Sequence, residues 1–394
     1  MLQMLLKSMD RTRFEHTLVA SDDYNEEAYE GLVDRFVRVK MCNALSPTTD
    51  SAAVREVRKI VRRLRPDIVY CHSSKAGGVG RLACIGLGVN VVYNPHGWAF
   101  SMKGSKVKRI IYLTLERMLA PFTTQFVAIS NYEKETAVGH GVARPERIKV
   151  IYNGVDIQAL KQAAANSVER KSLGIREDAY VVGMVGRIAP QKAPDVFLRM
   201  ADEVKHNIPE AHFMLVGDGI QRHELEEGIR KRKLNNCFTV TGWVDNPAEY
   251  VAMMDQVVLL SRWEGFGLVL VEYMVERKPV VATRVGGIPE IITDNENGLL
   301  VPVEDAHSAA AAVLKLYNNP TLKAEMIDKA EKKALAMFDM HRMAKEHERL
   351  FVNICKRGGK NESFTSSTCA SNGNRREEHV KELTRVAAIN PLGS

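Results

Sequence analysis

Short runs of β-branched and other apolar residues alternate along the chain with segments of helical periodicity. In the first part of the chain these runs occupy residues 14–21, 34–40, 66–73, 90–97, 124–130 and 147–153. A second series occupies residues 179–188, 212–219, 237–243, 255–261, 279–287 and 297–305. Alternation of this kind is typical of βαβ units with parallel sheets, so the pattern predicts an α/β fold.

Polar segments divide this pattern into parts. Asn153 and Gly154 form a turn signal after a predicted strand, and a polar, Ala-rich stretch follows them. Because 394 residues exceed what one hydrophobic core usually organises, we expect two domains. The expected parts are a first domain at 1–155, a second at 156–340, a helix at 341–356 that returns to the first domain, and a disordered tail at 357–394.

Composition is ordinary for a soluble globular chain, with 45% hydrophobic and 26% charged residues. The first residues carry too short an apolar run for a signal peptide and reach Asp10 early. The sequence has no stretch of the roughly 18 apolar residues that a spanning helix needs. We therefore expect a cytoplasmic protein. The six cysteines lack metal-ligand spacing. Asp22 and Asp23 have the wrong spacing for a metal-binding acid pair on a loop, and Asp294 and Glu296 are typical of a surface turn, so no metal is expected.

The net charge of +7 is concentrated in the first part of the chain. Lys and Arg outnumber Asp and Glu by 23 to 15 up to residue 150, and the counts after it are 32 and 33. Many of these cations fall at 55–65, on a segment of helical period, and at 103–109. Two interpretations stay open: a solvated helix face, or a surface that attracts anionic lipid headgroups. Nucleic acid is not expected, because the basic runs lack interleaved aromatics and a recognition motif.

Two cations follow the first strand of the second series. Gly186 and Arg187 come after that strand, and Lys192 lies in a loop that opens a helix near Pro194. Cations and helix N–H groups at the carboxyl end of a parallel strand suit a phosphate, because ligands gather at that edge of such sheets. Taken alone, the pattern is also typical of solvent-exposed charges.

The segment from Trp263 to Glu272 carries a stronger signal. Gly265 and Gly267 let the backbone approach a ligand closely, and the helix that they open directs N–H groups and a positive dipole end at an anion such as a diphosphate. Glu264 precedes this helix and Glu272 lies about one and a half turns inside it, so the two carboxylates would flank the anion. One can accept hydrogen bonds from a sugar and the other from a ribose. The alternative is a helix with one acid at its N-terminus and one on its surface.

Taken together, these motifs resemble the retaining glycosyltransferases of sequence family 4, the group 1 enzymes of surface polysaccharide synthesis. The resemblance extends from about residue 10 to residue 355. The matching pieces are E-x7-E at 264–272, GR…K at 186–192, VGDG at 216–219, TGWV at 241–244, GGIPE at 286–290, NGLLV at 297–301, HSSKAG at 72–77, PHG at 95–97 and NGVD at 153–156. The resemblance implies the GT-B fold, with two facing Rossmann-like domains and a cleft between them.

The resemblance also assigns roles to positions in the second domain. It implies that Arg187 and Lys192 neutralise the donor diphosphate, while Glu264 holds hydroxyls of the donor sugar. The implied donor-binding residues are Gly186, Gly217, Val244, Gly265, Phe266, Gly267, Leu268 and Glu272. Among them, Glu272 would bind the nucleotide ribose, and Val244 together with the turn at 216–219 would border the base.

In the first domain, the resemblance places His96 at the transferred sugar, where a polar ring could orient a hydroxyl. A His at a strand end is otherwise more often structural. Lys75 would lie near the acceptor. The implied mechanism is front-face displacement without a covalent intermediate, in which Arg187 and Lys192 stabilise the leaving diphosphate. Neither a metal nor another cofactor is needed for this chemistry.

The chain departs from the family pattern at two points. Family members begin with a strand and a Gly-rich loop, whereas residues 2–19 here match the helix that follows that loop. The first strand of the first domain is therefore expected to be missing. Three explanations stay open: the sheet tolerates the missing strand, a different segment takes its place, or the start codon has been misplaced. In addition, Ala193 stands after Lys192 where Gly is usual, which narrows the backbone freedom there.

The sequence thus favours a retaining hexosyltransferase that acts at the cytoplasmic face of a membrane. Its donor would be a nucleotide diphosphate sugar, with UDP favoured because it is common among similar enzymes, and its acceptor a lipid-linked or other glycan. An alternative is a noncatalytic protein that binds nucleotide sugar or a partner, because the first strand is missing. A sugar phosphorylase of the same fold is disfavoured, since no lysine suited to a covalent pyridoxal cofactor stands out.

Overall fold

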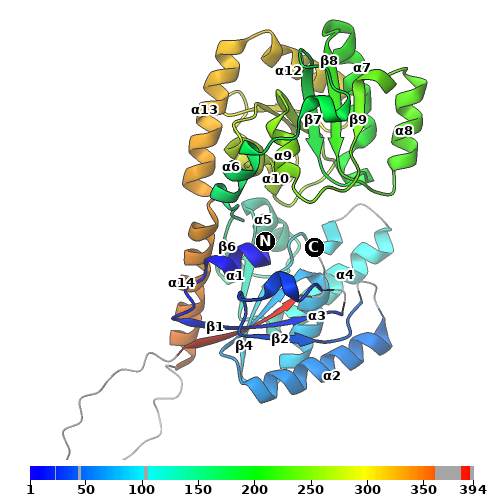
Figure 1. Ribbon diagram of the computed structural model, residues 1–394. Helices are drawn as coiled ribbons and strands as arrows, with labels where there is room; N and C mark the ends of the chain where they lie inside the picture. Colours follow the sequence, from blue (N-terminus) through cyan, green and yellow to red (C-terminus); the bar gives the residue numbers. More distant parts are fainter. Residues whose placement is uncertain (23, 43–45, 102–104, 360–382, 391–394) are drawn as a thin grey trace, which may run out of the picture. The chain divides into compact units, whose positions relative to one another are not determined.

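The computed structural model describes residues 1–22, 24–42, 46–101, 105–359 and 383–390. The chain divides into two compact units, which are coloured along the sequence in Figure 1. Unit 1 comprises residues 1–129, 133–152 and 341–394, and unit 2 comprises residues 130–132 and 153–340. Each unit contains one sheet whose paired strands are parallel, so the predicted α/β fold is confirmed.

Unit 1 is built on a seven-stranded sheet (Figure 1). In spatial order its strands are β2 (Arg35–Arg38), β1 (Phe14–Ala20), β13 (Thr384–Asn390), β3 (Ile68–His72), β4 (Asn90–Asn94), β5 (Gln125–Ala128) and β6 (Ile148–Val150). Parallel neighbours need crossover connections, and helices supply most of them. The helices of this part of the chain are α1 (Leu2–Ser8), α2 (Pro47–Leu64), α3 (Ser73–Cys84), α4 (Lys106–Leu119), α5 (Asn131–Gly139) and α14 (Met340–Gly359).

Helix α2 shows how the sequence pattern produces the local structure. Pro47 stands in its first turn, where the missing N–H group is not needed for a helical hydrogen bond. Val57, Ile60 and Val61 recur at helical spacing and are buried. The helix ends at Arg65, whose backbone is in the left-handed region with a φ of 45°. The predicted amphipathic helix with a basic outer face is therefore confirmed.

Unit 2 is built on a six-stranded sheet (Figure 1). In spatial order its strands are β12 (Leu299–Val301), β11 (Val280–Thr283), β10 (Gln256–Leu259), β7 (Tyr180–Val185), β8 (Ala211–Val216) and β9 (Phe238–Val240). Its helices are α6 (Ile157–Ala165), α7 (Pro194–Asn207), α8 (Arg222–Lys231), α9 (Pro247–Ala252), α10 (Leu268–Val275), α11 (Ile288–Ile291), α12 (Ala306–Tyr317) and α13 (Pro320–Met337).

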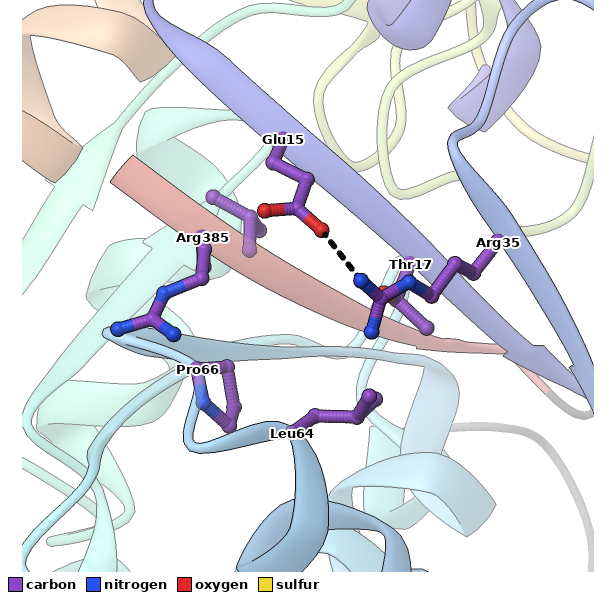
Figure 2. A pocket seen from close by; sticks show the side chains of 7 residues that line it. Glu15, Thr17, Arg35, Leu64, Pro66 and Arg385 are labelled. Carbon is purple, nitrogen blue, oxygen red and sulfur yellow. Dashed lines mark ion pairs between the residues drawn. The ribbon is translucent and has the colours of Figure 1, made fainter. Parts of the chain in front are cut away.

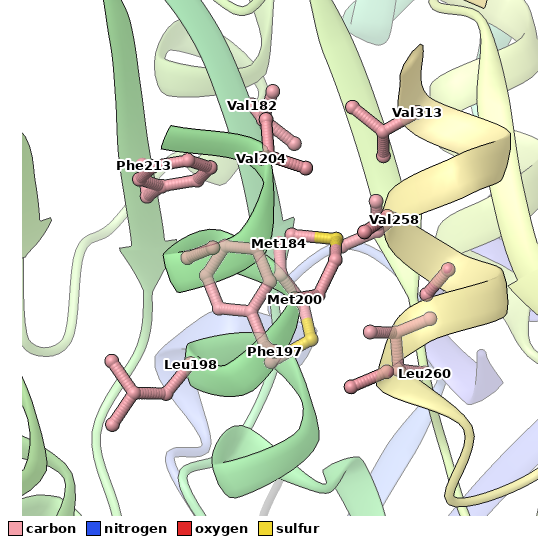
Figure 3. Close-up of a cluster of buried hydrophobic side chains, with 14 of the residues drawn as sticks. Val182, Met184, Phe197, Leu198, Met200, Val204, Phe213, Val258, Leu260 and Val313 are labelled. Carbon is pink, nitrogen blue, oxygen red and sulfur yellow. The ribbon is translucent and has the colours of Figure 1, made fainter. Parts of the chain in front are cut away.

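The core of unit 2 lies between its sheet and the helices α7 and α12 (Figure 3). Phe197 and Met200 of α7 pack with Val313 of α12 in a cluster that is shielded from solvent. The ring of Phe197 meets that of Phe213 edge to face, with the centroids 6.4 Å apart. Each such side chain contributes about 1.5–3 kcal/mol of hydrophobic stabilisation when fully buried. This packing gives the loops at the strand ends a rigid base.

Each of the twelve predicted apolar runs coincides with a strand of the structure, to within one residue at β8. The expectation of a disordered tail at 357–394 is wrong in part. Helix α14 continues to Gly359, and residues 384–390 form β13. Residues 360–382 and 391–394 lie outside the described residues. Strand β13 stands between β1 and β3, so a segment distant in sequence takes a central place in the sheet of unit 1.

A buried ion pair joins two helices of unit 1. The Arg81 side chain in α3 is only 1% exposed, and its Nη2 lies 2.8 Å from Oε2 of Glu116 in α4. Its Nε donates to the carbonyl of Gly77, and its guanidinium stacks over the Tyr93 ring at 4.1 Å. The hydroxyl of Tyr93 donates to the other oxygen of Glu116 at 2.8 Å. These contacts offset part of the cost of removing both charges from water, while Nη1 of Arg81 is buried without a hydrogen-bond partner within the described residues.

Replacing one partner of this pair should destabilise unit 1. Arg81→Met leaves the buried Glu116 carboxylate without its cation, which should lower the free energy of unfolding by about 3–5 kcal/mol. Adding Glu116→Gln removes the uncompensated charge and keeps an oxygen for Tyr93, so the double variant should recover most of that loss. Urea denaturation followed by circular dichroism measures both. A double variant as unstable as the single one would contradict the explanation.

Candidate active site

The candidate site of unit 2 lies at the carboxyl edge of its sheet. Because β7, β8, β10 and β11 are neighbouring parallel strands, the loops that follow them gather at this edge. These loops contain the predicted site residues of the second domain. Open α/β sheets bind their ligands at this edge, where helix N-termini also point.

Lys192 and Glu264 form the central contact of this site. Lys192 Nζ lies 2.5 Å from Glu264 Oε1, and the hydroxyl of Ser261 donates to the same oxygen at 2.9 Å. The side chains of Lys192 and Glu264 are 15% and 9% exposed. The contact joins the loop after β7 to the loop after β10. The structure thus brings together two residues that are 72 positions apart in sequence.

Arg187 lies beside this pair but remains exposed. Its Nη2 donates to the side-chain oxygen of Gln191 at 3.2 Å. The side-chain nitrogen of Gln191 in turn donates to the carbonyl of Trp263 at 3.1 Å. Arg187 is therefore linked through Gln191 to the same loop that carries Glu264, with its guanidinium accessible to an anion.

Glu272 lies in the second turn of α10 and is partly buried. Burial raises the pKa of its carboxyl, and the nearby Lys192 ammonium partly offsets this rise. Lys192 therefore acts electrostatically on both acids of the E-x7-E motif. The predicted arrangement, in which one acid precedes the helix and the other lies inside it, is found in the structure.

The turn before α10 is shaped by Gly267, which adopts a φ of 91° at the N-cap position. Phe266 is 2% exposed, and its ring packs edge to face on Phe338 with centroids 5.6 Å apart. The side chain of Phe266 thus anchors the loop, while the backbone of residues 266–268 forms the helix N-terminus. The N–H groups in the first turn of an α-helix have no partner within the helix, so this end suits an anion.

Close backbone packing holds these loops together. An ideal Cβ on Gly286 would lie 1.7 Å from the carbonyl oxygen of Glu264. One on Gly217 would lie 2.2 Å from the carbonyl oxygen of Gly186. Any side chain at either position would therefore push the loops apart. Ala193 takes a left-handed φ of 53° beside Lys192, which explains physically why glycine suits this position.

The predicted base-binding loops also meet. A β-bridge joins Gly217 of the VGDG turn to Gly242 of the TGWV loop. Arg222 extends from α8 to Asp218 at 2.8 Å, and Val244 lies half-buried in the second loop. The bridge thus brings together the two loops, which follow the neighbouring strands β8 and β9.

Arg262 is a positioning residue that the sequence did not reveal. It pairs with Glu304 and with Asp195 at 2.7 Å, and it donates to the carbonyl of Pro190 at 2.9 Å. Arg262 thus fixes the loop that carries Lys192 to the loop that carries Glu264. Its partners lie 67 and 42 residues away, so local sequence gave no signal for these contacts.

In unit 1, His96 follows β4, and its backbone lies in the left-handed region with a φ of 52°. The N–H group of His96 stabilises this conformation by donating to the side-chain oxygen of Asn94 at 3.1 Å. Its Nε2 lies 2.9 Å from Nδ1 of His72. Burial lowers the pKa of His96 to about 3, so its imidazole is neutral at physiological pH. His96 can therefore exchange hydrogen bonds with a hydroxyl without carrying charge.

A buried chain of polar groups that sequence reasoning missed stands behind His96. Nδ1 of His347 faces the carbonyl of Met343 at 2.9 Å, so this nitrogen carries the proton. Its Nε2 then accepts from the hydroxyl of Tyr70 at 3.0 Å, and that oxygen accepts from Asn94 at 3.4 Å. The directions of these bonds orient the side chain of Asn94 toward the backbone of His96.

Lys75 lies in the first turn of α3 and is mostly buried. Its Nζ contacts both carboxylate oxygens of Asp50 in α2, at 2.8 and 2.9 Å. This position follows β3 at the carboxyl edge of the sheet of unit 1, as does His96 after β4. The ammonium charge is balanced by Asp50 in this state.

Two family models match this chain. The model described as "Glycosyl transferases group 1" matches residues 166–333, and the model described as "Glycosyltransferase Family 4" matches residues 1–159. Together they cover most of the sequence, each on one of the two Rossmann-like parts. The chain therefore belongs to the group 1, family 4 glycosyltransferases, and its two Rossmann-like units are those of the GT-B fold.

Individual proteins show the same relationship. The UDP-Gal:alpha-D-GlcNAc-diphosphoundecaprenol alpha-1,3-galactosyltransferase of Escherichia coli is 30% identical over 287 residues, which are 72% of this chain and 74% of that protein. The D-inositol 3-phosphate glycosyltransferase of Kribbella flavida is 29% identical over 307 residues, covering 72% and 70%. Among solved structures, Anabaena HepE in complex with UDP and glucose matches with a TM-score of 0.75 at 23% identity, covering 89% of this chain and 94% of that one. This last likeness concerns the fold.

A buried acid beside the site should make stability depend on pH. Glu276 follows α10 and is 9% exposed, and neither of its carboxylate oxygens meets a hydrogen-bond partner within the described residues. Burial raises the pKa of this carboxyl from 4.5 to about 8. The pKa of Glu276 is higher in the folded protein than in the unfolded chain. The contribution of this carboxyl to the stability of the folded state is therefore fully present below pH 4.5 and is lost as the pH rises toward 8.

Glu276→Gln, which is neutral throughout, should therefore gain stability over the wild-type chain as the pH rises from 5 to 8. Thermal unfolding of both proteins across this range measures the difference. Glu325→Gln, at an exposed position of α13, is the matched control and should show no such trend. A difference between Glu276→Gln and wild type that stays constant with pH would contradict the buried carboxyl as its source.

Proposed function

We propose that the chain is a retaining hexosyltransferase that uses a UDP-sugar donor and a lipid-linked glycan acceptor. The observation that carries this proposal is the Lys192–Glu264 pair, with Glu272 nearby, at the helix N-terminus of a Rossmann-like sheet. The E. coli relative, by its name, uses UDP-Gal and a diphosphoundecaprenol-linked sugar. That name supports both the nucleotide and the class of acceptor.

In this proposal the donor diphosphate displaces the contact between Lys192 and Glu264. The Lys192 ammonium turns to the phosphates, and exposed Arg187 joins it from the same loop. The backbone at Phe266, Gly267 and Leu268 supplies N–H groups from the start of α10. Cationic groups and a helix dipole placed at the leaving group stabilise the charge that develops on it.

Release from Lys192 leaves the Glu264 carboxylate available to sugar hydroxyls, while the hydroxyl of Ser261 still donates to its Oε1. Glu272 accepts a hydrogen bond from the ribose. The acceptor hydroxyl attacks the anomeric carbon on the face from which the diphosphate leaves, so the configuration is retained without a covalent intermediate. In unit 1, neutral His96 orients a sugar hydroxyl, with His72 and Asn94 holding its ring and backbone.

A lipid-linked acceptor requires contact with a membrane surface, and we propose that α4 provides it. Its exposed side chains include Val107 at 65%, Ile110 at 64% and Met118 at 65%. These positions recur at helical spacing and form an apolar stripe along the fourteen-residue helix. Within the described residues, no helix combines the length and apolarity needed to cross a bilayer.

Charge favours anionic lipid as the partner of this stripe. Lys106 and Lys108 are exposed at the start of α4, while the one acid of the helix, Glu116, is buried against Arg81. An amphipathic helix with cations beside its apolar face binds at the headgroup boundary of anionic membranes. In α2, by contrast, the apolar residues are buried, so its exposed cations have no such stripe beside them. The predicted Lys103 contribution lies outside the described residues.

The donor site is tested by thermal unfolding with UDP, GDP and ADP. A nucleotide at about 100 times its dissociation constant should stabilise the native state by about 2.7 kcal/mol. We expect a selective shift with UDP that Glu272→Ala abolishes. Glu264→Ala should keep UDP affinity within a few fold, because Lys192 stays available, and should lose sugar transfer.

The control for these variants is Glu325→Ala on α13, which should change neither binding nor transfer. Equal loss of UDP binding in Glu264→Ala would contradict its assignment to the sugar. A selective response to GDP or ADP would overturn the choice of nucleotide. No response to any of them in a protein that melts cooperatively would overturn the donor site itself.

The membrane surface is tested with vesicles of equal parts phosphatidylglycerol and phosphatidylcholine. Ile110→Asp combined with Met118→Asp puts two charges on the stripe and should reduce cosedimentation at least tenfold, while UDP affinity stays unchanged. Ile220→Asp, which alters an apolar side chain of unit 2 that is 83% exposed, is the matched control. Equal binding by the double variant and the control would rule out α4 as the contact.

A further inference from the structure

Strand β13 takes a central position in the sheet of unit 1. Its seven residues pair with all of β1, from Phe14↔Thr384 to Ala20↔Asn390. On its other side it pairs with β3, from Ile68↔Val386 to Cys71↔Ile389. Both of its edges are therefore hydrogen-bonded within the sheet. β13 connects the β2–β1 pair to the β3–β6 part of the sheet.

Both faces of β13 are buried. Ala387 and Ile389 belong to the cluster on one face, and Ala388 belongs to a second cluster that includes Leu2 and Leu6 of α1. The fit is close, because an ideal Cβ on Gly80 of α3 would lie 3.1 Å from Ile389 Cδ1. The sequence Val-Ala-Ala-Ile thus matches a narrow space between helices, with small residues at its middle.

The amino end of β13 is held by specific polar contacts. Asp67 accepts from the N–H group of Arg385 at 2.7 Å, and its own N–H group donates to the carbonyl of Arg385 at 2.9 Å. The Arg385 side chain borders a cavity of about 80 Å³, where Glu15 lies 3.4 Å from Arg35 (Figure 2). The two hydrogen bonds between Asp67 and the backbone of Arg385 help to fix the register of β13.

Without β13, the backbones of β1 and β3 would face each other across two strand spacings, about 9–10 Å. Each would present a row of unpaired N–H and C=O groups, and buried unpaired groups are costly. Exposed strand backbones of this kind bind extended peptides by adding a strand. The space between β1 and β3 therefore has the shape and hydrogen-bonding groups of a peptide-binding slot.

A long segment of sequence precedes β13. Helix α14 ends at Gly359 and β13 begins at Thr384, so 24 residues separate them in sequence. The entropic cost of closing a connection of this length grows only slowly with its number of residues. A covalently attached strand nevertheless outcompetes a free one, because its effective concentration is in the millimolar range.

We propose that the slot between β1 and β3 is a strand-binding site. The segment Thr384–Asn390 of the same chain occupies this site. When the connection between α14 and β13 is cut, the site binds the same segment of a second copy equally well. The register places Asn390 one residue beyond the Ile389↔Cys71 pair, level with His72. Occupancy of the slot thus completes the sheet edge at which His72 contacts His96.

The test uses the full chain with a protease site introduced within residues 360–382 and cut after folding. The released strand should co-elute with the rest of the protein in gel filtration. A labelled peptide of residues 383–394 should bind the slot with the same affinity as the released strand. At equilibrium, a tenfold excess of this peptide should therefore leave about a tenth of the original strand bound. The same peptide with Ile389→Asp places a charge in the buried cluster and should not exchange.

Elution of the strand apart from a protein that melts as before cutting would overturn the proposal. So would equal exchange by the wild-type and Ile389→Asp peptides. A final comparison, which rests on the proposed function, follows UDP binding and sugar transfer after the released strand has been removed in denaturant and the protein refolded with an excess of either peptide. UDP binding by unit 2 should persist with both peptides, whereas transfer should return with the wild-type peptide and not with the Ile389→Asp peptide. Absence of transfer before cutting would count against the proposed function and leave the exchange result standing.

Discussion

Parallel strand pairing is the constraint on which the rest of this structure depends. When neighbouring strands run in the same direction, their carboxyl ends share one edge, and the loops that follow must meet there. In unit 2 this brings the loop of Lys192 to that of Glu264, although the residues are 72 positions apart. Glycines such as Gly286 and Gly217 then allow these loops to approach backbone to backbone.

Charges that the fold withdraws from water are balanced where they lie. Lys192 contacts Glu264 at the candidate donor site, and Arg81 contacts Glu116 in the interior of unit 1. The first pair is only partly buried and sits at a helix N-terminus, so an entering anion can compete for its cation. The second is enclosed by Tyr93 and serves the packing of two helices. Burial and access, more than the type of contact, distinguish the proposed functional pair from the structural one.

Much of the candidate site could be predicted because its residues follow strands in short motifs. Glu264, Glu272, Arg187 and Lys192 were identified this way, and the structure gathers them at one edge. Arg262 and the chain from His347 to Asn94 could not be predicted, because their partners come from distant segments without a spacing rule. β13 was missed for a related reason: a single short apolar run in a polar region resembles a loop until its neighbours are known.

The sequence by itself determined the alternation of strands and helices, the two Rossmann-like parts and the family, because periodicity and motif order are local properties. Only the tertiary structure decided that residues 384–390 complete the first sheet between β1 and β3. It also decided which cations are already paired and that His96 is neutral. Strand order, burial and ion pairing depend on contacts between residues far apart in sequence, and such contacts exist only once the chain has folded.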